Sequence, residues 1–281
     1  MLGIDGRPPQ PATPQRDDLA QLRLSGTVLV VEDNEINQKV ATAMLAALGL
    51  KTAVAPNGQV AVERLRGETF DLVLMDCQMP VMDGYAATAA IRALPEDRRG
   101  IPILALTANA LQGDEARCLA AGMNGFLTKP LTFQHLGTTL SRWLPTASRE
   151  SAAAAPAAQA PPESGAINMR QIATLRDIGE RAGTDLVGEV LQSFLEEAGP
   201  QLSRLEAAVQ SRDAMALARC AHAMKSSCAN LGAEQLSALY RRLENLGRNN
   251  QVDEAHALLQ ELRRAHEVVI RQAQEILREA A

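Results

Sequence analysis

The sequence is poor in aromatic residues, which make up only 2% of its 281 residues. Its cores must therefore be built mainly from Leu, Val, Ile, Ala and Met, which favours helices packed on helices or on a parallel sheet. No apolar run approaches the roughly 18–20 residues that cross a bilayer. The first residues, MLGIDGRPPQPATPQRDD, lack the hydrophobic segment of a secretory signal. We expect a cytoplasmic protein with no membrane segment in this chain.

Cysteine is also scarce, and acidic residues outnumber basic ones. The four cysteines, at positions 77, 118, 220 and 228, show no CxxC spacing and have no histidine at metal-ligand spacing. This pattern favours small buried thiols over a zinc site or a disulfide framework. The formal net charge of −5 argues against nucleic acid as a main partner.

Two differently patterned halves are present. Between residues 25 and 144, short apolar runs alternate with amphipathic stretches, which predicts a doubly wound, five-stranded parallel sheet of the flavodoxin type, an α/β fold. The runs are 27–31, 51–55, 71–75, 101–106 and 124–128. Residues 1–24 are a polar, Pro-rich lead-in that we expect to be disordered, and 145–165 form an Ala/Pro-rich segment that we expect to be a flexible linker.

From residue 166 to residue 281 only helical periodicity is seen, with expected interruptions at Gly183, Gly199-Pro200, Gly232 and Gly247. The pattern predicts an all-α unit, an antiparallel four-helix bundle with one or two accessory helices.

Polar residues follow the predicted strands at their carboxyl ends, where doubly wound sheets carry their chemistry. Glu32 and Asp33 follow the first strand, Asp76 the third, Thr107 the fourth and Lys129 the fifth. Clustered carboxylates need a divalent cation to offset their repulsion, and hard oxygen ligands suit Mg²⁺. With a lysine and a hydroxyl nearby, Asp76 could act as a nucleophile toward phosphorus. Taken singly, each has a simpler explanation: a turn former, a helix cap or a solvated lysine.

The blocks VLVVEDNEINQ, DLVLMDCQMPVMDGY, ALTANA and FLTKP resemble those of response-regulator receiver domains, most closely receivers attached to hybrid sensor kinases. The resemblance implies that Asp76 accepts the phosphoryl group and that Glu32, Asp33 and the Gln78 backbone carbonyl organise Mg²⁺. Lys129 would pair with the phosphoryl group, and Thr107 would swing to bind it. Phe126 stands at the position of the family's switch aromatic, although an ordinary core aromatic explains it equally well.

The helical half carries one distinctive histidine. Leu217, Ala221, Met224, Cys228 and Leu231 recur at bundle spacing, and His222 lies one residue off that seam, which predicts an exposed ring at the edge of the buried stripe. An imidazole nitrogen is a competent nucleophile near neutral pH.

The stretch AHAMKSSCANLGA resembles the signature of histidine-phosphotransfer (Hpt) domains. The resemblance implies that His222 is phosphorylated and that Lys225 helps it electrostatically. Ser226 departs from the glycine common at its position, but it is still small. Arg241 and Arg242 could form a basic rim for an acidic partner or could simply be solvated. His135, His256 and His266 lack the flanking pattern and receive no role.

Together these features predict a phosphorelay intermediate. An upstream histidine kinase would phosphorylate Asp76, the group would pass to His222, and a downstream response regulator would accept it. Reverse flow would make the chain a phosphate sink, and a phospho-Asp76-switched interaction module is a further alternative. No ATP lid or Gly-rich nucleotide box is seen, so we do not expect a kinase that autophosphorylates from ATP. Both a free-standing adaptor and part of a hybrid kinase fit the pattern.

Overall fold

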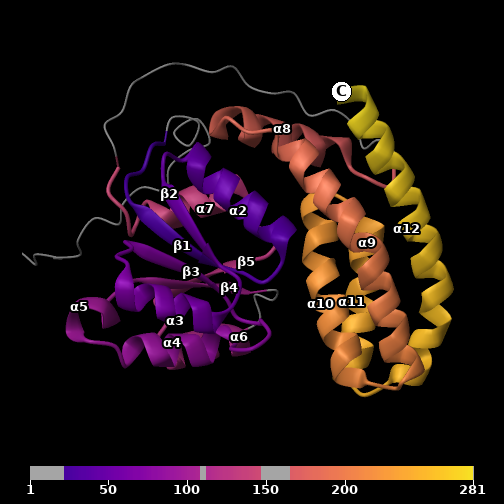
Figure 1. The fold of residues 1–281 in the computed structure, drawn as a ribbon, viewed down its shortest axis with the longest axis horizontal. Helices are drawn as coiled ribbons and strands as arrows, with labels where there is room; N and C mark the ends of the chain where they lie inside the picture. Colours follow the sequence, from indigo (N-terminus) through magenta and orange to yellow (C-terminus); the bar gives the residue numbers. More distant parts are fainter. Residues whose placement is uncertain (1–21, 108–111, 147–164, 281) are drawn as a thin grey trace, which may run out of the picture.

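The computed structural model describes residues 22–107, 112–146 and 165–280, without the side chains of 112–114 and 280. The predicted lead-in and linker, and the end of the ALTANA block, lie almost wholly outside these residues. Within them, an α/β half is followed by a helical half (Figure 1).

The α/β half contains the predicted five-stranded parallel sheet, in the order β2-β1-β3-β4-β5. Every residue of β3 and β4 is buried, as expected of strands covered on both faces. The predicted strands agree with the observed ones to within two residues. The strands are β1 (Thr27–Val31), β2 (Lys51–Ala55), β3 (Leu72–Asp76), β4 (Ile103–Thr107) and β5 (Gly125–Thr128).

Alternate strand residues enter two separate apolar clusters, one on each face of the sheet. One face is covered by α2 (Glu35–Ala47) and α7 (Phe133–Leu140). The other is covered by α3 (Gly58–Gly67), α4 (Gly84–Arg92) and α6 (Gln112–Ala120), and the short α5 (Glu96–Arg99) precedes β4. Because all five strands are parallel, their carboxyl ends lie at one edge of the sheet.

The helical half is the predicted bundle with one accessory helix (Figure 1). Its long helices are α9 (Leu186–Gln210), α10 (Ala214–Leu231), α11 (Glu234–Arg248) and α12 (Val252–Ala280), and α8 (Met169–Ala182) precedes them. Helices α8 and α10 end at Gly183 and Gly232, where interruptions were predicted, and both glycines adopt the left-handed conformation. Gly247 lies one residue before the end of α11.

The predicted interruption at Gly199-Pro200 is wrong, because α9 runs through both residues. A proline inside a helix removes one hydrogen bond and costs about 3 kcal/mol. Here the helix is held on both sides of Pro200 by its packing against α10, α12 and α2. Tertiary contacts therefore override the local signal.

The two halves are packed against each other through α2, which contacts α8, α9 and α10. One continuous apolar cluster runs from the α2 face of the sheet into the centre of the bundle. Arg181 of α8 also lies over the ring of Phe133 in α7, 5.5 Å from its centroid.

Three of the four cysteines are buried and Cys220 is half-buried, and all four are free. The sulfurs of Cys77 and Cys118 lie 3.7 Å apart. Among the described residues, no helix is both long and apolar enough to cross a bilayer.

Candidate functional site

Three acidic side chains converge at the carboxyl ends of β1 and β3. Carboxylate oxygens of Glu32, Asp33 and Asp76 all lie within 4.8 Å of one another. Capping of α2 does not account for them, because Asn34 is the N-cap and accepts the hydrogen bond from the backbone N–H of Asn37. The acids are therefore available as hard oxygen ligands for a divalent cation.

Lys129 reaches the same cluster from the end of β5, where a cis peptide joins it to Pro130. Its Nζ lies 2.7 Å from Oδ2 of Asp76 and 2.6 Å from Oε2 of Glu32, and its side chain is almost fully buried. Two anionic partners at this range keep the ammonium charged despite its burial.

Burial dominates the acid–base properties of this cluster. It raises the pKa of Glu32 to about 7 and raises the pKa of Asp33, in both cases with the negative charge of Asp76 adding to the effect and Lys129 opposing it. Burial acts to lower the pKa of Lys129, but the charges of Asp76 and Glu32 outweigh it and the pKa is raised. The cluster thus holds more negative charge than Lys129 alone balances, so a cation or an incoming phosphoryl group bound through a cation would be stabilised.

The loop after β3 is fixed tightly around Asp76. The backbone N–H of Gln78 donates to Oδ1 of Asp76 at 3.2 Å. A Cβ on Gly84 would lie 2.2 Å from the carbonyl oxygen of Asp76, so only glycine fits at the start of α4. Thr107 is buried at the end of β4, and Phe126 is half-buried on β5 opposite Ala105.

On α10, His222 is held by an acid that the sequence analysis did not identify. Nδ1 of His222 lies 2.8 Å from Oε1 of Glu244 on α11, and Nζ of Lys225 lies 2.6 Å from Oε2 of the same carboxylate. Burial opposes ionisation of Glu244, but its bonds to His222 and Lys225 lower its pKa to about 2. An ionised Glu244 accepts a hydrogen bond from Nδ1–H. The other ring nitrogen, Nε2, then carries the lone pair of the imidazole.

A sequence signal for Glu244 exists in retrospect. Leu236, Tyr240, Leu243 and Gly247 form the buried stripe of α11, and Glu244 lies in that stripe. An acid at a core position of a bundle helix needs a partner. The sequence does not reveal which partner.

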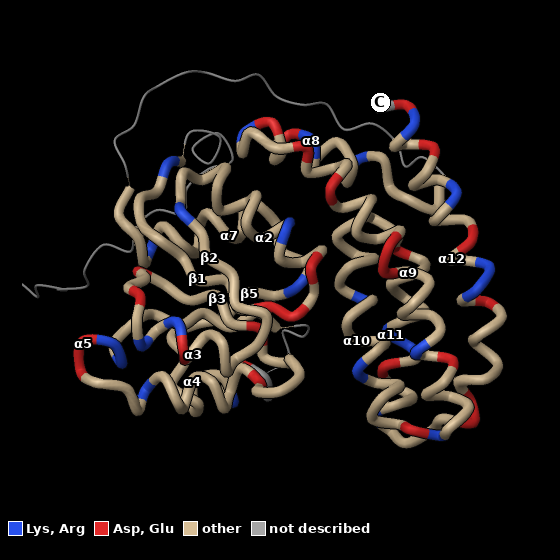
Figure 2. The backbone as a smooth tube through the Cα atoms, in the orientation of Figure 1, with Lys and Arg blue, Asp and Glu red and all other residues tan. Residues whose placement is uncertain are grey.

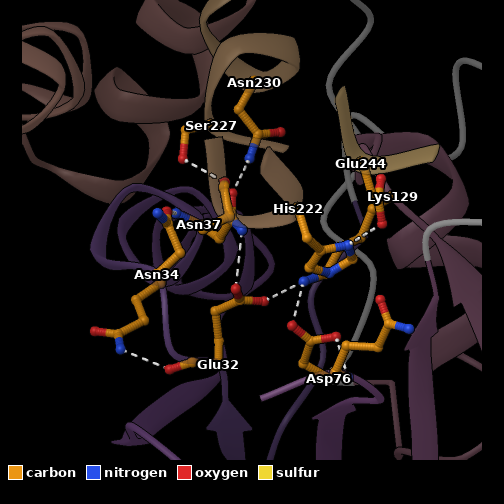
Figure 3. Close-up of polar contacts among 12 residues, drawn as sticks. Glu32, Asn34, Asn37, Asp76, Lys129, His222, Ser227, Asn230 and Glu244 are labelled. Atoms are coloured by element: carbon orange, nitrogen blue, oxygen red, sulfur yellow. Dashed lines mark hydrogen bonds and ion pairs between the residues drawn. The ribbon is translucent and has the colours of Figure 1, made fainter. Parts of the chain in front are cut away.

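His222 and the acidic cluster lie together between the two halves (Figure 3). Asp33, Gln78 and His222 line one cavity of about 590 Å³. Nε2 of His222 is fully buried there and has no hydrogen-bond partner among the described residues. The prediction that the ring is solvent-exposed is wrong: its side chain is 13% exposed, because the α/β half covers the helix edge that the sequence pattern assigned to solvent.

Of the two alternatives for Arg241 and Arg242, the solvated one describes them, because both are exposed and neither lines the cavity. Arg242 is exposed and lies 3.8 Å from Glu261 of α12. Instead Arg204, Arg219 and Arg248 line the cavity, and Arg248 donates to Oε1 of Gln78 at 2.8 Å. Figure 2 shows acidic positions at the strand ends and basic positions on the bundle helices opposite them.

Comparison with protein families identifies both halves. The response regulator receiver domain model matches residues 28–141, and the Hpt domain model matches residues 189–272. The chain is a receiver domain followed by an Hpt domain. It is homologous to the C-terminal part of hybrid sensor kinases and belongs to two-component phosphorelay signalling. No kinase domain is found within this chain.

Among the relatives, the sensor histidine kinase GacS of Pseudomonas protegens is 32% identical over 84% of this chain, and BarA of Shigella flexneri is 32% identical over 83%. The chain spans only 26% and 25% of these two proteins. A solved receiver domain of a sensor histidine kinase from Pseudomonas aeruginosa is 49% identical, with a TM-score of 0.40. The match covers 42% of this chain and 97% of that one, and that structure has a magnesium ion in its active site cleft.

Proposed function

We propose that the chain is a phosphorelay intermediate that accepts a phosphoryl group on Asp76 and passes it to His222. One observation carries the proposal. The acidic cluster of Glu32, Asp33 and Asp76 lies at the same interdomain site as Nε2 of His222, which has no hydrogen-bond partner among the described residues. We assign residues 25–144 to the receiver, 145–165 to the linker and 166–281 to the Hpt domain. An upstream histidine kinase and a downstream response regulator, all in the cytoplasm, complete the proposal.

The acidic cluster fits Mg²⁺, because three carboxylates lie within 4.8 Å and Lys129 balances only part of their charge. Glu32, Asp33 and Asp76 would hold the ion, with the Gln78 carbonyl as a further ligand. Bound there, Mg²⁺ supplies positive charge for the equatorial phosphoryl oxygens. Lys129 supplies a second positive charge from the protein itself, and Thr107 and Phe126 remain the proposed switch residues.

Transfer between the domains needs no external base. Nε2 of His222 forms the new N–P bond while the O–P bond to Asp76 breaks and the carboxylate of Asp76 is regenerated. The Nδ1 proton stays between the ring and Glu244, so the positive charge that develops on the imidazole is balanced by an ionised acid 2.8 Å away. Lys225, held on the same carboxylate, lies ready to pair with the transferred phosphoryl oxygens.

The test uses acetyl phosphate with a radioactive phosphoryl group and Mg²⁺, and separates acid-stable acyl phosphate from base-stable phosphohistidine. Wild type, Asp76→Asn and His222→Gln are compared. We expect label on Asp76 first and then on His222, label retained on Asp76 in His222→Gln, and no label on either residue in Asp76→Asn. If wild-type Asp76 is labelled and His222 never is, the chain is a switched interaction module instead. Rapid loss of all label to water without transfer to any added receiver domain would indicate a phosphate sink.

A further inference from the structure

Helix α2 is buried on two sides. Eight of its thirteen residues are buried, including Ala41, Ala43 and Ala47. A helix that covers only one face of a sheet keeps its outer side polar and exposed. The outer side of α2 is instead closed by α8, α9 and α10 of the Hpt domain. On this outer side Ala41 lies with Asn37 beside Ser226 and Asn230 of α10, and its small side chain leaves room for the bundle helix.

A buried pair of asparagines joins the two domains within this contact. Nδ2 of Asn230 on α10 donates to Oδ1 of Asn37 on α2 at 2.8 Å, and both residues are buried. An amide left without its partner in such a place would be strongly unfavourable, so the pair fixes one register between α2 and α10. Asn230 lies eight residues after His222 on the same helix, about 12 Å along its axis.

The pair is connected directly to the acceptor site (Figure 3). Nδ2 of Asn37 donates to Oε1 of Glu32 at 2.8 Å, while Lys129 bonds both Glu32 and Asp76. An unbroken chain of hydrogen bonds therefore runs from the helix that carries His222 to the carboxylate of Asp76.

Polar contacts around this pair favour the same register. Nζ of Lys39 donates to the hydroxyl of Ser193 at 2.6 Å, and Nδ2 of Asn34 lies 3.4 Å from Oε2 of Glu197. At the other side of the site, Arg248 contacts Gln78. These contacts come from α2 and the β3–α4 loop on one side and from α9 and α11 on the other.

We propose that Asp76 and His222 exchange the phosphoryl group within one chain, from this closed state, and that Asn37 and Asn230 are the positioning pair that sets His222 over Asp76. The proposal rests on the proposed function. It also has a consequence for the outgoing step. The face of α10 around His222 is covered by the chain's own receiver, so a separate regulator reaches His222 only after the chain opens.

Mixing two variants tests transfer within one chain. Asp76→Asn retains His222, and His222→Gln retains Asp76, so transfer in the mixture has to occur between chains. A tethered partner acts at an effective concentration of about 1 mM, so at roughly 1 μM chains we expect transfer in the mixture at least about a hundredfold slower than in wild type. The wild-type rate should not change with dilution. Equally fast transfer in the mixture would overturn this inference and leave the proposed function standing, whereas an unlabelled His222 in wild type would sink the proposed function itself.

The positioning pair is tested with Asn230→Ala, and Asn245→Ala, at an exposed position of α11, is the matched control. Loss of one buried hydrogen bond corresponds to about a tenfold slower transfer to His222. We expect the rate of Asp76 phosphorylation and the helix content measured by circular dichroism to remain close to wild type. Asn245→Ala should match wild type in every respect.

A second measurement separates positioning from misfolding. Diethyl pyrocarbonate modifies accessible histidine nitrogens, and mass spectrometry reports each site. We expect His222 to be protected in wild type and to react faster in Asn230→Ala, while exposed His135 and His256 react in both and buried His266 in neither. Unchanged protection of His222 together with unchanged transfer would contradict a role for the pair.

Discussion

At the scale of single residues, the proposed phosphorylation of His222 depends on Glu244. Glu244 accepts a hydrogen bond from Nδ1–H of His222, pairs with Lys225 and accepts from Arg248 at 2.5 Å. Sequence pattern identified His222 and Lys225 because they occupy a known motif. It missed Glu244, because the contact joins two helices and is defined only by how their faces meet.

We expect Glu244→Gln to slow phosphorylation of His222 by about ten- to a hundredfold, since a hydrogen bond to a charged group contributes about 1.5–3 kcal/mol. The glutamine oxygen still accepts from Nδ1 but no longer balances the positive charge that develops on the ring. Labelling of Asp76 should remain at the wild-type rate. Glu196→Gln on the exposed side of α9 is the control, and equal rates in both variants would contradict this role.

His266 is a second buried histidine with a purely structural setting. It is hydrogen-bonded to the hydroxyl of Tyr240 and stacked on Phe194, and burial lowers its pKa to about 4. Below pH 6.5 the histidine is protonated in the unfolded chain but stays neutral in the folded chain. The contribution of His266 to stability is therefore complete above pH 6.5 and is lost as the pH decreases toward 4.

Between pH 6.5 and pH 4, protonation linked to His266 should lower the free energy of unfolding by up to about 3 kcal/mol. Denaturant unfolding between pH 4 and 7 measures it. His266→Gln, which keeps an acceptor for Tyr240, should flatten the slope, whereas His256→Gln on the surface should not change it. Glu244 affects stability in a different pH range. Because its pKa is lowered, its contribution to the free energy of unfolding is lost only as the pH falls from 4.5 toward 2.

At the scale of elements, strand and helix positions followed from the sequence, since buried parallel strands and bundle seams impose strong periodicity. Local signals failed where packing decided the outcome. Helix α9 continues through Pro200, and the outer side of α2 contacts the bundle although its periodicity is that of an ordinary helix covering a sheet. From the sequence alone, Asn37 and Asn230 are expected to be polar surface residues. Their contact is evident only in the structure, because it joins helices of two different domains.

Two glycines in the bundle should respond oppositely to alanine. A Cβ at Gly199 meets nothing within 4 Å, so Gly199→Ala should stabilise α9 by about 0.5–1 kcal/mol through backbone entropy. A Cβ at Gly247 would lie 2.7 Å from the carbonyl oxygen of Ala214 and from the backbone nitrogen of Ala218, so Gly247→Ala should destabilise the bundle. Free energies of unfolding in urea measure both. A destabilised Gly199→Ala would show that α9 is distorted there.

At the scale of the whole molecule, the apolar cluster that joins α2 to the bundle makes the two domains one packed unit. The sequence predicted both domains but not this contact, because two domains joined by an Ala/Pro-rich segment are compatible with any relative placement.

We expect the full chain to unfold in a single calorimetric transition, because the shared core couples the two domains. Combining Lys39→Ala, Arg181→Ala and Asn230→Ala removes polar interface contacts but leaves the shared apolar core in place, and should lower the melting temperature while the transition stays single. Two transitions already in the unmodified chain would show that the interface is weak.

The receiver also begins and ends at one place. Leu24 forms an antiparallel bridge with Thr146, and the backbone N–H of Ser25 donates to the carbonyl of Pro145 at 3.0 Å. The first and last residues of this domain therefore lie side by side. Both covalent connections of the receiver thus lie at one point of its surface, and its other links to the bundle are non-covalent contacts, chiefly through α2.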